Sequence, residues 1–153
     1  MSTRTLQYEE VFNCSPEVLF NALKTPSIIR SWWGAERVIL IARPGGAFAL
    51  AWGDDEDDPE YMGTATLSEY DPPRRLVMTD FIYYAKSGPL GFEAEFSVEF
   101  AVHPHDRGSM LTLAHRGIPT IPEADEYYEG CEIGWRTCLA NLRAFLEGDG
   151  QSA

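Results

Sequence analysis

Apolar and polar residues alternate along the middle of the chain in the manner of β-strands. The clearest alternation runs from Phe92 to Val102, where every second residue is apolar. Because successive side chains of a strand point to opposite faces of a sheet, one face of this strand is predicted to be buried and the other to contact water. Similar patterns predict the full set of strands at 4–12, 38–41, 47–52, 61–70, 74–83, 91–103 and 109–116.

Helix signals occur after the first predicted strand and at the end of the chain. Ser15-Pro16-Glu17 combines an N-cap residue, a proline suited to the first helical turn and an acid near the positive end of the helix dipole. Thr25-Pro26-Ser27 begins a second short helix. From Pro122 onwards, apolar residues recur at helical spacing between Cys131 and Leu146, and the pattern stops at Gly148. The sequence therefore predicts two short helices and one long terminal helix.

The segments between the predicted strands are short and rich in glycine, proline and aspartate, which is typical of turns between antiparallel neighbours. One of them is an acidic run from Asp54 to Asp58, predicted to be a solvated hairpin loop because its spacing lacks the order of an EF-hand calcium loop. The order of elements describes an α+β domain. We expect a curved antiparallel sheet of six or seven strands that holds the terminal helix on its concave face, with a cavity where the sheet does not close.

The chain of 153 residues has the size of one domain, which is predicted to span 1–148, with a short flexible tail at 149–153. It carries 24 acidic and 12 basic residues, for a formal net charge of −12. Binding to nucleic acid or to anionic membranes depends on Lys and Arg, so neither is an expected partner. The sequence has no apolar run long enough to span a bilayer and no leader-like start, which predicts a cytoplasmic protein.

Few side chains offer reactive chemistry. The three cysteines, Cys14, Cys131 and Cys138, cannot form a closed set of disulfides and show no C-x-x-C spacing, so we expect no metal and no cofactor. Cys131 and Cys138 share one face of the terminal helix and are expected to be small core residues. His103 and His105 lie beside a turn and are expected to be exposed.

His115 falls on the core-facing side of its predicted strand, together with Leu111 and Leu113. Two roles fit this position. It is either a hydrogen-bonding tip or base inside the cavity, or a structural histidine bonded to a backbone carbonyl or a water.

Asp80 also has two interpretations. Either Leu76, Met78 and Ile82 face inward and Asp80 enters the cavity with them, or Val77, Phe81 and Tyr83 face inward and Asp80 is solvated. The cost of burying an unpaired carboxylate favours an outward, solvated Asp80.

Aromatic residues from separate elements are predicted to surround one interior space. Flat side chains, some with polar tips, suit an apolar ligand with a few hydrogen-bonding groups; the alternative is that they fill a solid core. Gly130 and Gly134 remove side-chain bulk from one patch of the terminal helix, which would admit either a ligand or a closely packed strand. The candidate ligand-binding residues are Trp33, Trp52, Phe81, Tyr83, Phe92, Phe96, His115, Trp135, Cys138 and Leu142.

Several short motifs follow one another along nearly the whole chain. They are Ser15-Pro16-Glu17-Val18 with Leu23, Trp32-Trp33-Gly34, the Gly63 strand leading to Asp71-Pro72-Pro73-Arg74-Arg75-Leu76-Val77, Gly108 to His115, and Gly134-Trp135 with Leu139 and Leu142. This order resembles the START/SRPBCC superfamily and, within it, the family of homologues of the activator of heat-shock protein 90 ATPase. The resemblance implies a helix-grip fold with an apolar cavity, used in the superfamily to bind lipids, steroids or polyketides and at times for cyclase or hydrolase chemistry.

Three functions follow as hypotheses. The first is non-catalytic binding of a small apolar or aromatic molecule, lipid-like or polyketide-like, between the sheet and the terminal helix. The second is a stress-related co-chaperone-like role, with a heat-shock protein 90 type ATPase as the partner. The third is a polyketide cyclase or hydrolase-like enzyme that uses His115. The expected partners are therefore a small hydrophobic molecule, and a chaperone or a second copy of the chain.

Overall fold

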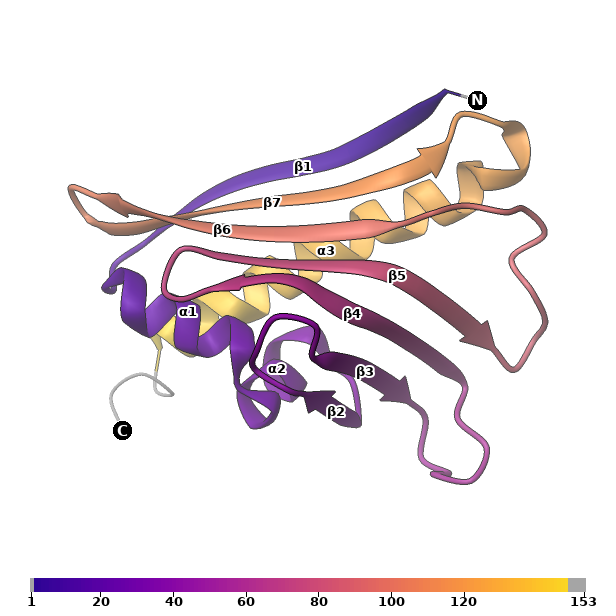
Figure 1. Ribbon diagram of the computed structural model, residues 1–153, viewed down its shortest axis with the longest axis horizontal. Coiled ribbons are helices and arrows are strands. Elements are labelled where there is room, and N and C mark those ends of the chain that lie inside the picture. Colours follow the sequence, from indigo (N-terminus) through magenta and orange to yellow (C-terminus); the bar gives the residue numbers. More distant parts are fainter. Residues whose placement is uncertain (1, 149–153) are drawn as a thin grey trace.

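The computed structural model describes residues 2–148, which form one antiparallel sheet with the strand order β1-β7-β6-β5-β4-β3-β2 (Figure 1). From β2 to β7, each strand pairs with its neighbours in sequence, as the short predicted turns require. β1 forms the opposite edge by pairing with β7. The strands are β1 (Thr3–Phe12), β2 (Arg37–Leu40), β3 (Ala47–Trp52), β4 (Tyr61–Asp71), β5 (Arg75–Ala85), β6 (Ser97–His105) and β7 (Gly108–Pro119).

The helices begin and end at residues that explain their boundaries. The amide of Val18 donates to Ser15 Oγ over 3.2 Å, which caps the first helix as predicted. The second helix ends where Gly34 adopts a φ of 82°, a left-handed conformation that costs glycine little. The helical segments are α1 (Pro16–Lys24), α2 (Pro26–Trp33), the short 3₁₀ turn η1 (Pro122–Ala124) and α3 (Asp125–Glu147).

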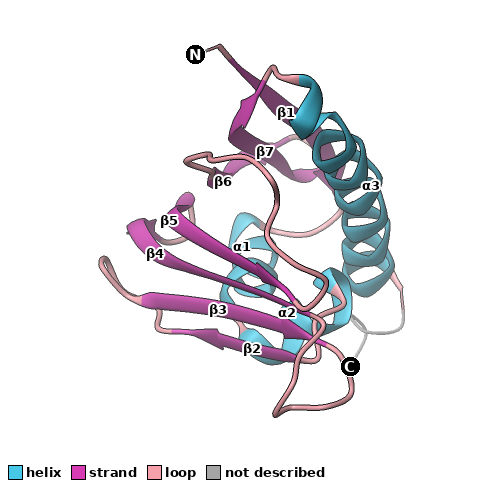
Figure 2. Cartoon of the chain, turned by 90° about the vertical axis from the view of Figure 1, so that its right-hand side faces the viewer, coloured by secondary structure: helices cyan, strands magenta, loops and turns pink. Residues whose placement is uncertain are grey.

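The sheet curves around α3, and the short helices α1 and α2 lie at one end of the concave side (Figure 2). Apolar side chains from the inner face of the sheet and from all three α-helices form the core, including the fully buried Phe12, Leu67 and Phe100. This arrangement confirms the predicted α+β helix-grip fold, with seven strands in the sheet.

Polar contacts tie α3 to the β1 edge of the sheet at both of its ends. Arg143 donates to the carbonyl oxygen of Val11 over 2.9 Å and to the carboxylate of Glu10 over 3.2 Å. At the other end, Arg4 forms an ion pair with Asp125 at 2.7 Å. The helix is therefore held along β1, and the β2 to β5 side of the curved sheet faces it across the interior (Figure 2).

The predicted strand at 91–103 is wrong in its first half, because β6 begins only at Ser97. Phe92 and Phe96 still turn toward the core, so the alternation is real, but the chain there has no strand partner among the described residues. Alternation reports which side of an extended chain is buried and does not require a hydrogen-bonded neighbour. As a result, β5 and β6 pair only along Arg75–Met78 of β5.

A β-bulge interrupts β5 at Asp80, whose backbone φ is 57°. Thr66 of β4 pairs with Thr79, whereas Thr64 pairs with Ile82, so β5 carries one more residue than β4 between these pairs. An extra residue of this kind bends the strand and reverses the side on which the following side chains point.

This reversal answers the question of which β5 residues face inward. Leu76 and Met78 are buried before the bulge, and Phe81 and Tyr83 line the interior after it. Asp80 itself is exposed, as the cost of burying a carboxylate predicts. Each of the two alternative inward sets is therefore correct for one half of the strand and wrong for the other: Ile82 of the first set is exposed, and Val77 of the second is not part of the core.

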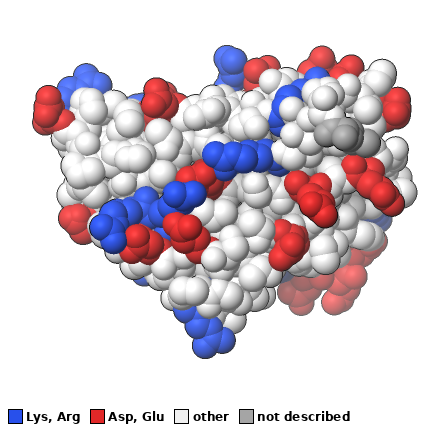
Figure 3. Space-filling model, turned by 45° about the horizontal axis from the view of Figure 1, so that its top comes forward, with Lys and Arg blue, Asp and Glu red and all other residues white. Residues whose placement is uncertain are grey.

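Several charged side chains of the outer surface form ion pairs with one another. Arg75 contacts Glu69 and Glu99 at 3.0 Å each, and Arg116 contacts Glu99 at 2.7 Å. Figure 3 likewise shows basic side chains beside acidic ones on the face in view.

Within residues 2–148, no helix is both long enough and apolar enough to cross a membrane. The tail predicted at 149–153 lies outside the described residues.

Candidate ligand-binding cavity

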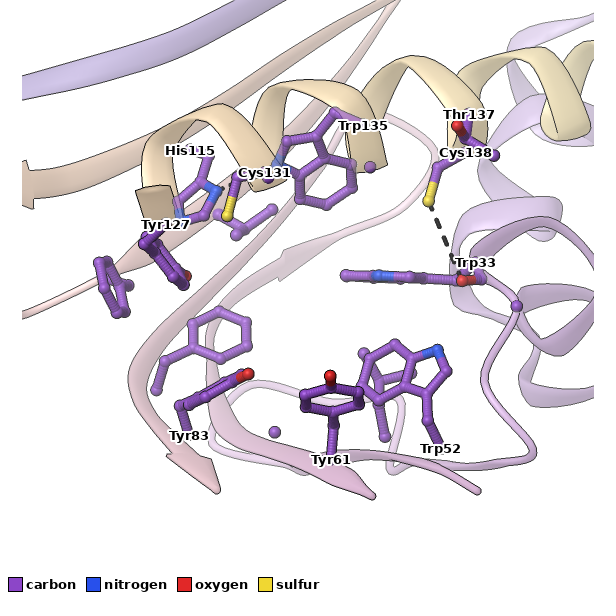
Figure 4. Close-up of a pocket in the computed structure, with 18 of the residues that line it drawn as sticks. Trp33, Trp52, Tyr61, Tyr83, His115, Tyr127, Cys131, Trp135, Thr137 and Cys138 are labelled. Atoms are coloured by element: carbon purple, nitrogen blue, oxygen red, sulfur yellow. Dashed lines mark hydrogen bonds between the residues drawn. The ribbon is translucent and has the colours of Figure 1, made fainter. Parts of the chain in front are cut away.

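A cavity of about 850 Å³ lies between α3 and the inner face of strands β3 to β7 (Figure 4). This part of the interior is therefore hollow and not filled by side chains. The wall of the cavity is mainly apolar and aromatic. The lining residues are Trp33, Gly34, Leu50, Trp52, Tyr61, Gly63, Phe81, Tyr83, Phe96, Val98, His115, Glu126, Tyr127, Gly130, Cys131, Gly134, Trp135, Thr137, Cys138 and Asn141.

Most of the candidate residues from the sequence lie in this wall, and two do not. Leu142 is fully buried in the core beside α2 and does not line the cavity. Helical spacing places it on the same stripe as Cys138, but α2 covers this end of α3, where Asn141 Nδ2 donates to the carbonyl oxygen of Trp32 over 3.4 Å. The candidates that line the cavity are Trp33, Trp52, Phe81, Tyr83, Phe96, His115, Trp135 and Cys138.

Phe92 is the second candidate outside this wall. It lies on the segment between β5 and β6 and lines a separate cavity of about 670 Å³ together with Phe81, Tyr83 and Phe96. Its ring contacts that of Tyr127, with centroids 5.8 Å apart. A continuous strand over 91–103 would carry Phe92 in the sheet. This prediction is wrong because the chain joins the sheet only at Ser97.

His115 and Trp135 form a buried polar contact in the wall of the main cavity. The indole Nε1 of Trp135 donates to Nδ1 of His115 over 3.0 Å. Because Nδ1 accepts this bond, a neutral imidazole carries its proton on Nε2. Nε2 has no hydrogen-bond partner within residues 2–148. This atom is not fully buried by the described residues, and His115 lines the cavity, so Nε2 is accessible from the cavity.

Burial keeps the His115 ring uncharged. Only 5% of the residue is exposed, and desolvation lowers the pKa of His115 from 6.5 to about 4. At pH 7 the ring is therefore neutral and offers an N–H donor to the cavity. The structural partner expected for a buried histidine was a backbone carbonyl or a water; the partner in the structure is the Trp135 indole.

Two consecutive tryptophans at the end of α2 have different environments. Trp32 is buried, and its Nε1 donates to the carbonyl oxygen of Ala22 over 2.8 Å, which holds α2 against α1. Trp33 lines the cavity, with its ring centroid 5.1 Å from that of Trp135. The thiol of Cys138 contacts the Trp33 carbonyl oxygen at 4.0 Å (Figure 4). The Trp33 ring thus packs against α3, while the helix that carries it is held to α1 by Trp32.

Tyr61, Tyr127 and Cys131 also line the cavity, and the sequence prediction omits them from the site. Tyr61 directly opposes Trp52 in the pairing of β3 with β4, so strand alternation contains the signal for its inward side. Tyr127 precedes Cys131 by four residues and extends the same helical stripe by one turn. It stacks on Phe96, with centroids 4.8 Å apart.

The thiols in the cavity wall are weak nucleophiles. Burial raises the pKa of Cys131 to about 11 and that of Cys138 to about 12. Both are therefore protonated at pH 7, and a thiol attacks far more slowly than a thiolate. Cys14, the remaining cysteine, is buried elsewhere, and all three are free.

Two glycines leave the middle of α3 without side chains. A Cβ atom added at Gly130 or at Gly134 would meet nothing within 4 Å. Of the two roles predicted for this patch, close packing against a strand is thus wrong. The patch instead borders the cavity, which widens it along the helix.

Residues 13–147 match the family model described as Activator of Hsp90 ATPase homolog 1-like protein. The chain belongs to this family. The family resemblance of its sequence motifs is thereby confirmed. A search of the curated proteins found no significant match for this chain.

Solved structures share the fold of this family member at low sequence identity. MLL2253 from Mesorhizobium loti aligns with a TM-score of 0.75 and 23% identity, covering 94% of this chain and 97% of that one. CV1439 from Chromobacterium violaceum aligns with a TM-score of 0.72 and 22% identity, covering 95% and 99%. DynU16, from the dynemicin biosynthetic locus, aligns with a TM-score of 0.70 and 15% identity, covering 94% and 47%. These likenesses establish a common fold.

Proposed function

We propose that this protein binds a small apolar or aromatic molecule in the cavity between α3 and the sheet, without transforming it. The cavity volume of about 850 Å³ falls in the range of small-molecule sites, and such sites are usually lined by apolar and aromatic side chains with a few polar groups. The open patch at Gly130 and Gly134 lets a flat ligand approach the backbone of α3.

The observation that carries this proposal is the accessible N–H of His115. Trp135 occupies Nδ1 and leaves the Nε2 proton directed at no protein acceptor within residues 2–148. An accessible N–H in an apolar wall that makes no bond to the protein can donate to a ligand, so a ligand that supplies an acceptor gains binding free energy there. The ligand therefore has an oxygen or another acceptor on an otherwise apolar body.

The same contact argues against His115 as the base of a cyclase or hydrolase. A general base needs a free lone pair within reach of the substrate, and the Nδ1 lone pair of His115 is engaged by Trp135. A pKa of about 4 also makes His115 a weak base at pH 7. Binding without catalysis is therefore the better supported function.

Pyrenylmethanol, a flat neutral molecule with a hydroxyl acceptor, tests the proposal. Its binding is followed by energy transfer from the tryptophans in the cavity wall. We expect saturable binding to the wild type and a loss of at least about tenfold in affinity for Gly134→Leu, which fills the open patch.

Ala140→Leu is the matched control, since it adds the same side chain to an exposed position of α3 outside the cavity. It is expected to bind like the wild type. No saturable binding to the wild type, or unchanged binding to Gly134→Leu, would contradict the proposal.

A co-chaperone-like role and a homodimer stay predictions. Their direct tests are acceleration of a heat-shock protein 90 type ATPase by this chain and the mass of the protein in solution.

A further inference from the structure

Aromatic rings line the mouth of the cavity at several angles. Tyr61 on β4 and Tyr83 on β5 are 46% and 37% exposed. The ring centroids of Tyr61 and Tyr83 are 6.4 Å apart, and those of Tyr83 and Tyr127 are 6.3 Å apart with the rings nearly perpendicular. The three tyrosines thus form a continuous series of rings from the sheet to α3 (Figure 4). We call this series the tyrosine rim.

Negative charge lies next to the tyrosine rim. Glu126, which precedes Tyr127 on α3, lines the cavity and is exposed. The lining residues within the described part of the chain include no Lys or Arg. The acidic loop Asp54–Asp58 joins two further lining residues, Trp52 and Tyr61.

The cations nearest to the acidic loop are paired with it. Lys86 contacts Asp58 at 2.7 Å, and Arg37 contacts Glu56 at 3.8 Å. Asp54 and Asp57 have no such ion pair among residues 2–148. This end of the molecule therefore keeps an excess of negative charge, in keeping with the net charge of −12 of the whole chain.

These features select the charge of a ligand. The faces of aromatic rings carry negative potential and attract cations, and the attraction is stronger where water is excluded. Fields of one sign around a cleft raise the local concentration of ligands of the opposite sign. An anionic ligand would meet no cationic partner in the wall, and burying an unpaired carboxylate is costly.

We propose that the ligand of this cavity carries a cationic nitrogen, as an amine or a quaternary ammonium group on an apolar or aromatic body. The cationic group lies at the tyrosine rim beside Glu126, and the body occupies the cavity. His115 is more deeply buried, with its ring centroid 6.1 Å from that of Tyr127, and donates to an acceptor on the body of the ligand. This inference rests on the proposed binding of an apolar molecule and adds the charge of its head group.

Three probes with one aromatic body separate the two proposals. Pyrenylmethylammonium is cationic, pyrenylmethanol is neutral and pyrenylacetate is anionic, and energy transfer from tryptophan reports the binding of each. We expect the ammonium to bind about tenfold more tightly than the alcohol at low salt, because its gain at the tyrosine rim exceeds that of the hydrogen bond to His115, which the alcohol can make and the ammonium cannot. The carboxylate is expected to bind most weakly. Added salt should reduce the difference between the ammonium and the alcohol, because screening weakens the attraction to exposed carboxylates.

Variants assign the preference to the tyrosine rim. Glu126→Gln and Tyr83→Leu are each expected to lower the ammonium-to-alcohol affinity ratio about threefold; the ratio is the readout because it divides out any loss in binding of the common pyrene body. Glu129→Gln is the matched control, because it removes an exposed α3 carboxylate that does not line the cavity. It should retain the wild-type ratio.

The outcomes distinguish the two proposals. Binding of pyrenylmethanol with no preference for the ammonium overturns the cationic-ligand inference and leaves the proposed function standing. A preference that is lost equally in Glu129→Gln assigns it to the general field of the protein and overturns the role of the tyrosine rim. Failure of all three probes to bind overturns both.

Discussion

Trp135 fixes the tautomer of His115, and burial keeps that ring neutral. A histidine in this state behaves as a hydrogen-bond donor fixed in an apolar wall. The same residue type at an exposed position of β6, such as His103, has no comparable surroundings. Its neighbours, more than its identity, therefore determine what His115 can do.

The lowered pKa of His115 predicts a specific dependence of stability on pH. Between pH 6.5 and about 4, the unfolded chain binds a proton at this residue and the folded protein does not, so the free energy of unfolding falls as the pH is lowered through this range. From pH 7 to pH 4.5, the wild type should lose about 2 kcal/mol more than His115→Gln, measured by urea unfolding.

His103→Gln serves as the control for this measurement, because it removes an exposed histidine from the same sheet. Parallel pH profiles for the wild type and His115→Gln would show that His115 is not held neutral by burial.

The sequence contains part of this residue-level description. Strand alternation places His115 on the inner face with Leu111 and Leu113, and the structure agrees. Its bond to Trp135 joins β7 to α3 and depends on how the helix crosses the sheet. No spacing within one element encodes that crossing, so the tautomer and the pKa shift of His115 could not be predicted.

At the scale of elements, the sequence pattern predicts which helices and strands exist better than it predicts how the strands pair. Helix caps and strand alternation predict every helix and most strand boundaries to within a few residues. The errors fall where an extended chain leaves the ladder, as before Ser97, or where one residue is added to it, as at Asp80. Both depend on the neighbouring strand, which the local sequence does not show.

The backbone conformation of the bulge at Asp80 restricts which residues are tolerated at this position. A φ of 57° is tolerated by glycine and, to a lesser degree, by aspartate, whereas a β-branched side chain is strained there. Asp80→Val should lower the free energy of unfolding by about 1–2 kcal/mol, and Asp80→Gly should change it by less than about 1 kcal/mol.

Ile82→Val, at an exposed site of the same strand after the bulge, gives the comparison for a valine in an ordinary strand conformation. If Asp80→Val unfolded at the same urea concentration as Ile82→Val, the left-handed conformation at Asp80 would not constrain the strand.

At the scale of the whole molecule, curvature creates the cavity. α3 is held along β1 by Arg143 and Arg4, while the sheet turns away toward β2, so helix and sheet separate on that side. The element order predicts this geometry, but whether side chains fill the space depends on the absence of bulk at Gly130 and Gly134. The sequence alone does not decide whether the space is filled, because glycines on a helix are compatible both with close packing and with an open cavity.

The short pairing between β5 and β6 has a dynamic consequence. After Met78, the edge of β5 that faces β6 has no strand partner within residues 2–148, so the amide protons on that edge are expected to exchange with deuterium much faster than those between β1 and β7. Mass spectrometry of peptides covering 79–85 and 110–116 measures the contrast, and equal protection would contradict it. Since Phe81 and Tyr83 belong to both this edge and the cavity, brief opening here would set how quickly a bound molecule escapes, independently of how tightly it is held.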